Sequence, residues 1–367
     1  MGRGQVSGLD LELEHDRVEL VSDPQTGLRG VIAIHSRVLG PAMGGLRLTR
    51  YPGLEAAVVD ALRLSRAMTL KNSAAGLDLG GGKAVLVDDG AWADLALREA
   101  RMRVLGRRIE RLGGNYVTAE DVGTSPADMV AIGHETRWVA GRPTDAGGRG
   151  DPSAATARTV FAAVRAGAQV HLGADSPAGL RVGVLGAGHV GSRLARTLVE
   201  AGAEVLVADI RQERVADLAA TLGVVPVKPR DLIFADVDVL SPCALGGVIE
   251  PRHVGLIRAK VIAGAANNQL ADPALADALD AAGILFVPDF IANSGGIIDV
   301  GAEVLGLDDQ EVEHRLLEAE LRLKDILVRA ADSDRTPWDL AVELAHERVA
   351  RAAGEADTTA VREEIHR

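Results

Sequence analysis

The chain has 367 residues, which exceeds what one ordinary hydrophobic core fills and fits two domains of common size. Hydrophobic residues make up 47% and charged residues 25%, so the composition is globular and excludes a disordered chain. The formal net charge is -12 and no segment is rich in Lys and Arg, so nucleic acid and anionic membranes are not expected partners. Small-molecule substrates are favoured.

Cysteine usage and hydropathy restrict the cellular setting. Cys243 is the only cysteine, which rules out an internal disulfide and a thiolate metal site, so we expect a reducing cytoplasm and no bound metal. No apolar run approaches the roughly 18 to 20 residues that span a bilayer, and the first residues lack the apolar region of a signal peptide. The sequence therefore predicts a protein that works away from membranes.

Residues 1–148 are predicted to form one α/β domain that binds substrate. Short apolar runs over 9–50 indicate strands, and apolar residues at helical intervals indicate a helix over 54–72 that ends in a glycine loop, Gly80–Gly82. The elements expected after this loop are a strand over 83–87, a helix over 95–112 capped by Asp94, a strand over 116–119 and a helix starting near Ser125.

A stretch rich in Gly, Asp, Arg and Pro, residues 141–152, is predicted to connect this domain to a second one over 149–332. Strands and helices alternate there with short turns, which predicts a doubly wound parallel sheet of the Rossmann type, with a cleft between the two domains. The expected strands lie at 181–185, 204–208, 237–240, 260–263 and 284–287.

Two long amphipathic segments, near 309–332 and 336–353, close the chain. The helices at about 333–356 could pack back on the first domain. The charged residues 357–367 are expected to form a disordered tail.

A cofactor motif opens the second domain. Gly186, Gly188 and Gly191 form a G-x-G-x-x-G directly after a predicted strand and at the start of a helix. The first glycine permits a tight turn, the second lets backbone amides approach a pyrophosphate, and the third allows close packing of helix on strand. The predicted dinucleotide site includes the variable positions His189 and Val190, and His189 is expected to be exposed without a catalytic role.

The end of the next strand indicates which dinucleotide binds. Asp209 lies 23 residues after Gly186, near the spacing at which a carboxylate accepts both ribose hydroxyls of NAD. Arg211 and Arg214 lie close by and could pair with the 2′-phosphate of NADP, but the carboxylate would repel that phosphate. NAD is therefore the predicted cofactor.

The most unusual local feature is a pair of lysines, Lys71 and Lys83, that flank a nearly uncharged segment. A lysine near another cation in a partly dry site loses its proton more easily and becomes a general base near neutral pH, while the second lysine would stay charged and hold a carboxylate. Asp121 supplies a carboxylate at a strand end, where active-site groups of α/β sheets often lie. Any one of the three alone would more often be a solvated surface residue, but together they predict a catalytic site.

Motifs at residues 40–45, 68–72 and 80–85 resemble the leucine, valine and phenylalanine dehydrogenases, which are relatives of glutamate dehydrogenase. The resemblance implies NAD-dependent, reversible oxidative deamination of an L-amino acid to its 2-oxo acid with release of ammonia. Further similar segments, which extend the resemblance to roughly residues 10–350, lie at 118–124, 241–247, 263–269 and 288–296.

The resemblance also implies roles for individual residues. Lys71 would hold the substrate carboxylate, Lys83 would activate the water that attacks the imino carbon, and Asp121 would exchange protons with the amino group. Asn268 would contact the amino-acid end of the substrate. The cofactor contacts implied outside the glycine motif are Thr156, Ala244 and Asn267.

The same resemblance implies the substrate class. Glutamate dehydrogenases carry a lysine, which binds the side-chain carboxylate, where this chain has Met43. An unpaired distal carboxylate would lose several kcal/mol on desolvation, so apolar substrates of the valine, leucine or phenylalanine type are favoured. The other residues implied for substrate binding are Gly44, Ala119, Ile297 and Val300.

Two features leave parts of this interpretation open. Thr159 stands where the family usually has glycine, so helix packing near the cofactor is expected to differ. The chain has only nine aromatic residues, which leaves few stacking partners for an aromatic substrate without excluding one. Relatives assemble as dimers or octamers through the first domain, so a homo-oligomer is expected.

Two other functions remain possible from the sequence. A Rossmann oxidoreductase acting on another small substrate, such as a hydroxy acid, would leave the two lysines unexplained and would usually need a histidine acid/base, for which no comparable constellation exists. A non-catalytic NAD-binding regulatory protein would not need Lys71, Lys83 and Asp121 together.

Overall fold

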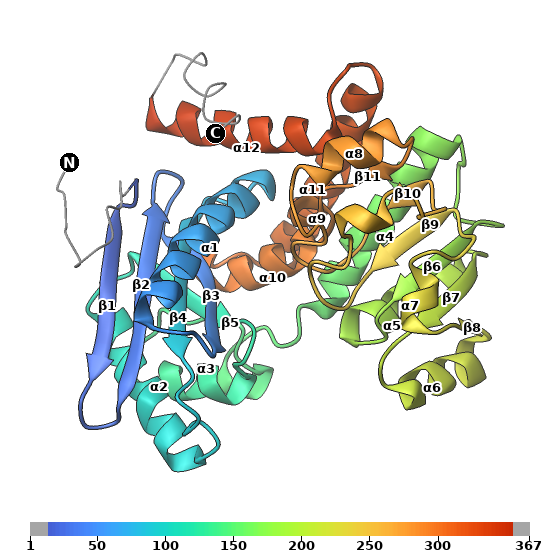
Figure 1. Cartoon of the computed structure of the whole chain (residues 1–367). Helices are drawn as coiled ribbons and strands as arrows, with labels where there is room; N and C mark the ends of the chain where they lie inside the picture. Colours follow the sequence, from blue (N-terminus) through green and yellow to red (C-terminus); the bar gives the residue numbers. More distant parts are fainter. Residues whose placement is uncertain (1–13, 355–367) are drawn as a thin grey trace.

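Residues 14–354, which the computed structural model describes, form two α/β halves that lie side by side, each built on its own sheet (Figure 1). The first half runs from the N-terminal side to about residue 140, and the second contains the remaining strands. This confirms the predicted α/β class. The first sheet is mixed and the second is parallel. In this described range no helix is long and apolar enough to cross a membrane.

The first half is a five-stranded mixed sheet in the order β1-β2-β4-β3-β5. β1 and β2 form an antiparallel hairpin, and β3 pairs in parallel with both β4 and β5. Helix α1 covers one face and helices α2 and α3 cover the other. The elements are β1 (Arg17–Asp23), β2 (Leu28–Ser36), β3 (Ala42–Thr49), α1 (Leu54–Ala74), β4 (Gly80–Val87), α2 (Leu95–Glu110), β5 (Tyr116–Glu120) and α3 (Pro126–Gly133).

The predicted glycine loop after the first helix is wrong, because Gly80–Gly82 form the start of strand β4. The glycines are required by packing. A Cβ on Gly81 would lie 2.1 Å from the Thr69 hydroxyl oxygen, since α1 rests directly on the strand. A Cβ on Gly82 would lie 2.7 Å from the ring of Tyr116 on the other side. The absence of side chains lets α1 and β4, which carry Lys71 and Lys83, pack closely.

The second half is a six-stranded parallel sheet in the order β11-β10-β9-β6-β7-β8, so the predicted doubly wound sheet is confirmed. Helices α4, α5 and α6 pack on one face, and α7 and α8 on the other. The strands are β6 (Arg181–Leu185), β7 (Glu204–Ala208), β8 (Val225–Pro226), β9 (Val239–Pro242), β10 (Val261–Ile262) and β11 (Leu285–Phe286). The helices are α4 (Ser153–Leu172), α5 (His189–Glu200), α6 (Gln212–Leu222), α7 (Pro229–Leu232) and α8 (Leu275–Ala281).

The chain returns to the first half after the last strand. Short α9 (Asp289–Ala292) leads into α10 (Ser294–Leu305) and α11 (Asp309–Ala331), whose apolar residues share a core with the first half. Helix α12 (Pro337–Ala353) then packs on α1 (Figure 1). There the Ser73 hydroxyl donates to the Ala345 carbonyl at 2.7 Å, and Arg348 donates to the Leu77 carbonyl at 2.7 Å.

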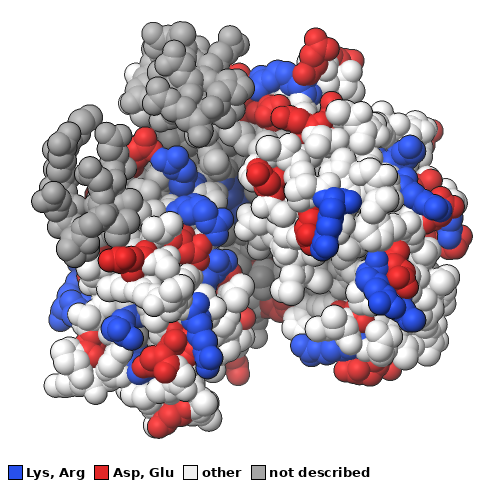
Figure 2. Space-filling model, viewed as in Figure 1, with Lys and Arg blue, Asp and Glu red and all other residues white. Residues whose placement is uncertain are grey.

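Surface charge is mixed. On the face seen in Figure 2, Lys and Arg side chains are interspersed with Asp and Glu, and no extended basic patch is present among the residues drawn in colour. The predicted disordered tail lies outside the described residues.

Candidate active site

A cavity of about 400 Å³ lies between the two halves, within the roughly 300–1,000 Å³ range of small-molecule sites. On the second half it lies at the carboxyl ends of strands β10 and β11, where ligands of parallel α/β sheets bind. The site residues predicted from the sequence that line it are Met43, Gly44, Lys71, Lys83, Ala119 and Asp121 from the first half and Thr156, Val190, Asn267, Asn268, Ile297 and Val300 from the second.

Lys83 and Asp121 form the centre of the site. Lys83 extends from β4 and its Nζ donates to Asp121 Oδ2 at 2.5 Å, just past the end of β5. Burial lowers the pKa of the Lys83 amine, although Asp121 opposes the effect. Burial raises the pKa of the Asp121 carboxyl, but Lys83 and Arg47 outweigh it and the net shift is downward. Both groups therefore have the environment of a proton-transfer pair.

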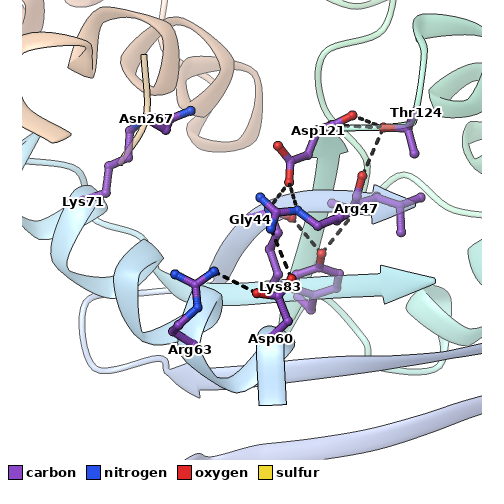
Figure 3. A network of polar contacts seen from close by, with 12 residues as sticks. Gly44, Arg47, Asp60, Arg63, Lys71, Lys83, Asp121, Thr124 and Asn267 are labelled. Atoms are coloured by element: carbon purple, nitrogen blue, oxygen red, sulfur yellow. Dashed lines mark hydrogen bonds and ion pairs between the residues drawn. The ribbon is translucent and has the colours of Figure 1, made fainter. Parts of the chain in front are cut away.

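Lys71 lies in the last turn of α1 and reaches across the cavity to the second half. Its Nζ donates to Asn267 Oδ1 at 3.0 Å. Burial lowers the pKa of Lys71 to about 8, and the carboxylates of Asp289 and Asp121 oppose the decrease. In Figure 3 Lys71 and Asn267 lie apart from the Lys83 cluster, which leaves space between the two lysines.

Arg47 is a charged site residue that the sequence analysis missed. Its Nε donates to Asp121 Oδ2 at 3.3 Å and its Nη1 to Asp60 Oδ2 at 3.1 Å, so it lies between the two carboxylates (Figure 3). Strand alternation offered a signal, because Met43, Gly45 and Arg47 share one face of β3 and all line the cavity.

An amide cluster closes the second half's side of the cavity. The Asn293 amide donates to Asn267 Oδ1 at 2.9 Å, the same oxygen that accepts from Lys71. Asn268 has a φ of +51°, the single positive value outside glycine in residues 14–354, and such strain often accompanies functional sites. The Asp289 carboxylate accepts from the backbone amides of Gln269 and Phe290 at 3.0 and 2.8 Å. No sequence pattern indicated a site role for Asn293 or Asp289.

The turn between β6 and α5 fits a dinucleotide. Gly186 has a φ of +116°, and a Cβ there would lie 2.8 Å from the Ala244 amide nitrogen. A Cβ on Gly191 would lie 1.9 Å from the Gly186 carbonyl oxygen, whereas a Cβ on Gly188 would meet only Nη1 of Arg214, at 4.0 Å. The first turn of α5 contains no acidic residue and no side-chain cap, so its backbone amides are free to donate hydrogen bonds to a phosphate.

Asp209 and His189 lie beside this turn. Asp209 follows the end of β7, and its two oxygens accept from the backbone amides of Ala187 at 2.7 Å and Arg211 at 2.8 Å. His189 is 77% exposed, and its Nδ1 lies 3.6 Å from Asp151 Oδ2. It lines a second cavity of about 640 Å³, which adjoins the first one at Ala119 and Asp121.

Thr159, at the position where glycine was expected, links two helices of the site. Its hydroxyl donates to the Thr156 carbonyl at 3.2 Å within α4 and accepts from the Gly295 amide at 3.0 Å in the first turn of α10. Helix α10 carries Ile297 and Val300, so the hydroxyl joins the helix of Thr156 to the wall of the cavity.

This combination of a doubly wound sheet, a glycine turn and a two-lysine cleft defines an amino-acid dehydrogenase that uses a nicotinamide cofactor. Two family models match the chain: "Glu/Leu/Phe/Val dehydrogenase, dimerisation domain" over residues 15–138 and "Glutamate/Leucine/Phenylalanine/Valine dehydrogenase" over residues 206–356. The chain belongs to this family.

Leucine and valine dehydrogenases are similar to the chain over nearly its whole length. Leucine dehydrogenase of Geobacillus stearothermophilus is 40% identical over 336 residues, covering 92% of this chain and 91% of the relative. Valine dehydrogenase of Streptomyces virginiae is 41% identical over 341 residues, covering 92% and 94%. The crystal structure of L-tryptophan dehydrogenase from Nostoc punctiforme superposes with a TM-score of 0.81 at 33% identity, covering 94% of this chain and 98% of that one.

Proposed function

We propose that the protein catalyses the NAD-dependent, reversible oxidative deamination of an L-amino acid with an apolar side chain to its 2-oxo acid and ammonia. The observation that carries this proposal is the apolar wall of Met43, Ile297 and Val300 beside the Lys71, Lys83 and Asp121 side chains. Met43 is fully buried and offers no cation to a distal carboxylate. The names of the relatives, leucine, valine and tryptophan dehydrogenase, are consistent with this substrate class.

Lys71 is proposed to hold the substrate carboxylate, with Asn268 on the amino-acid end. The Nζ of Lys71 is placed for this task because it donates to Asn267 Oδ1 at 3.0 Å. The pKa of Lys71 is about 8, so the amine is charged below that pH. A substrate held there directs its α-carbon between the two lysines and its side chain toward Met43, Gly44, Ala119, Ile297 and Val300.

Asp121 and Lys83 are proposed to move the protons. Asp121 accepts a proton from the substrate ammonium, and the freed lone pair forms the C=N bond as hydride leaves the α-carbon. Bound NAD supplies the acceptor of that hydride. Neutral Lys83 then takes a proton from the water whose oxygen adds to the imino carbon, and Asp121 returns its proton to the nitrogen of the resulting carbinolamine. The hydroxyl proton of the carbinolamine then passes to the Asp121 carboxylate as the C=O bond forms, the C–N bond breaks and ammonia departs. The 2.5 Å contact between the two side chains allows them to share protons during these steps.

The dinucleotide is proposed to bind at the turn of Gly186, Gly188 and Gly191, including His189 and Val190, with its pyrophosphate at the start of α5. Asp209 would accept the ribose hydroxyls, which favours NAD over NADP. Further contacts are proposed for Thr156, Ala244 and Asn267, which lie beside the turn or in the cavity.

A homo-oligomer, as a dimer or octamer, is proposed to form through the first half, supported by the match of residues 15–138 to a dimerisation domain. The proposed domains are residues 1–148 for substrate binding and 149–332 for NAD binding, in a protein of the reducing cytoplasm. Light scattering on the purified chain would give the assembly state.

The test of the function is the formation of reduced nicotinamide, followed by absorbance, with L-valine, L-leucine, L-isoleucine, L-phenylalanine, L-tryptophan and L-glutamate, each with NAD and with NADP. Activity on an apolar substrate with NAD is expected, and activity on glutamate alone would contradict the substrate class. NAD binding by calorimetry with no turnover of any amino or hydroxy acid would favour a non-catalytic protein.

A further inference from the structure

We propose that Arg47 is a positioning residue of this site, which by bridging Asp121 and Asp60 sets the charge balance at Lys83 and aims one oxygen of Asp121 at the substrate. The proposal deepens the proposed function and rests on it for its kinetic consequences. Its geometric basis is a chain of contacts that runs from α1 through β3 to the end of β5 (Figure 3).

The first observation concerns the two oxygens of Asp121. Oδ2 accepts from Lys83 at 2.5 Å and from Arg47 at 3.3 Å, so both cations use the same atom. Neither side-chain cation uses Oδ1, and the backbone amide of Val122 also contributes to lowering the pKa of the carboxyl. The backbone of Asp121 is fixed as well, because its amide donates to the Thr124 hydroxyl at 3.0 Å. Arg47 therefore holds the carboxylate in the rotamer that leaves Oδ1 for the substrate ammonium.

The second observation is that Asp60 on α1 fixes the guanidinium of Arg47. Asp60 Oδ2 accepts from Arg47 at 3.1 Å and from the Tyr51 hydroxyl at 2.6 Å, while Asp60 Oδ1 accepts from Arg63 at 2.8 Å. The side chains of Arg47 and Asp60 are only 21% and 17% exposed. With its guanidinium engaged at both Nε and Nη1, Arg47 is not free to swing toward a substrate carboxylate.

The third observation is the sign of each charge at Lys83. The charged groups that face its amine are Asp121 from the end of β5, Arg47 from β3 and Asp60 from α1, with Lys71 at the far side of the cavity. Arg47 lowers the pKa of Lys83, whereas Asp60 raises it. Arg47 and Asp60, which form one ion pair, thus shift the pKa of Lys83 in opposite directions.

The test is the pH profile of kcat/KM for amino-acid oxidation, which rises as Lys83 becomes neutral. Arg47→Gln is expected to move this rise to higher pH by about one unit, and Asp60→Asn to move it to lower pH. Arg47→Lys keeps the charge, so its profile stays in place while kcat falls, because one amine cannot bridge both carboxylates. Arg63→Gln, which alters an exposed partner of Asp60, is the control and should leave the profile unshifted.

A merely structural role would give a different pattern. If Arg47→Gln and Asp60→Asn both lower activity with unshifted profiles, or shift in the same direction, the proposal is wrong. A raised KM in Arg47→Gln with an unmoved profile would instead assign Arg47 to binding the substrate carboxylate. Thermal unfolding and affinity for reduced nicotinamide, measured on every variant, identify any that fail to fold.

A second readout separates this proposal from the proposed function. The rate at which acetic anhydride acetylates Lys83, followed by mass spectrometry of its peptide across pH, reports the titration of that amine without turnover. Opposite shifts in Arg47→Gln and Asp60→Asn are expected here too, even if no amino acid proves to be a substrate. Unshifted titration in both variants would overturn the role of Arg47 while leaving the dehydrogenase activity unaffected.

Discussion

At the scale of single residues, the two lysines of the cleft differ in their hydrogen-bond partners. Lys83 is 5% exposed and pairs with a carboxylate, so its environment suits a group that gains and loses a proton. Lys71 contacts a neutral amide, Asn267, which leaves its charge uncompensated at short range and suits the binding of an anion. This contrast supports the division of labour between them.

Removing the amine of Lys83 tests the assignment most directly. Lys83→Ala is expected to lower kcat by about 10²–10⁴-fold, the usual contribution of a general base, while NAD affinity stays unchanged. Stopped-flow kinetics and fluorescence titration with reduced nicotinamide would measure both. Near-normal turnover in this variant would remove Lys83 from its role.

The substrate class depends on Met43. Met43→Lys places an amine in the apolar wall, and kcat/KM for glutamate should rise relative to that for leucine or valine, because a distal carboxylate gains a partner. Met43→Leu, which conserves volume and polarity, is the matched control and should keep the original preference. An unchanged ratio in Met43→Lys would show that residue 43 does not contact the substrate side chain.

The pKa of Lys71 predicts how carboxylate binding depends on pH. Because burial lowers it to about 8, the charged form is complete well below pH 8 and is lost as the pH rises through that value. The inhibition constant of a branched carboxylic acid without an amino group should therefore rise by about tenfold per pH unit above pH 8. In Lys71→Arg the guanidinium stays charged, so the inhibition constant should not change with pH. An inhibition constant that is independent of pH in the parent protein would contradict the prediction.

At the scale of elements, periodicity located most helices and strands because each has one apolar face against a core. It failed at Gly80–Gly82, where a run of glycines resembles a loop but forms a strand under α1. It also failed to indicate β8, a two-residue edge strand with both residues exposed and no burial pattern to detect. Local sequence patterns therefore miss a strand whose glycines are required by a neighbouring helix, and a strand that has no buried face.

The side-chain hydroxyl of Thr159 links α4 to α10. Thr159→Val removes the acceptor for the buried Gly295 amide and should lower the free energy of unfolding by about 1–3 kcal/mol. Because α10 carries Ile297 and Val300, KM for the amino acid should rise as well. Thr159→Ser keeps the hydroxyl and is expected to behave like the parent protein in chemical denaturation and kinetics, and equal effects of both variants would exclude the hydroxyl as the link.

At the scale of the whole molecule, the site is assembled from residues that lie far apart in sequence. Motifs and resemblance nominated Lys71, Lys83 and Asp121, and the cavity brings all three together. The bond from Lys71 to Asn267 and the bridge by Arg47 were not predictable, because each depends on how separate elements approach one another.

Helix α12 ties the end of the chain to the first half. Ending the chain after Ser333 would remove the burial of Leu340, Ala341 and Ala345 and should cost several kcal/mol of stability together with most activity. Ending it after Gly354 retains the helix and should have little effect. Thermal unfolding of both truncated proteins, with activity as the second measurement, would decide whether α12 is needed.

The course of the chain has a kinematic consequence for the cleft. The polypeptide leaves the first half through residues 141–152 and comes back through α10 to α12, so two covalent crossings join the halves. A body held at two points swings about the line that joins them and resists twisting about any other axis. Any relative motion of the two halves should therefore follow a single arc, which restores the contact between Lys71 and Asn267 in one orientation.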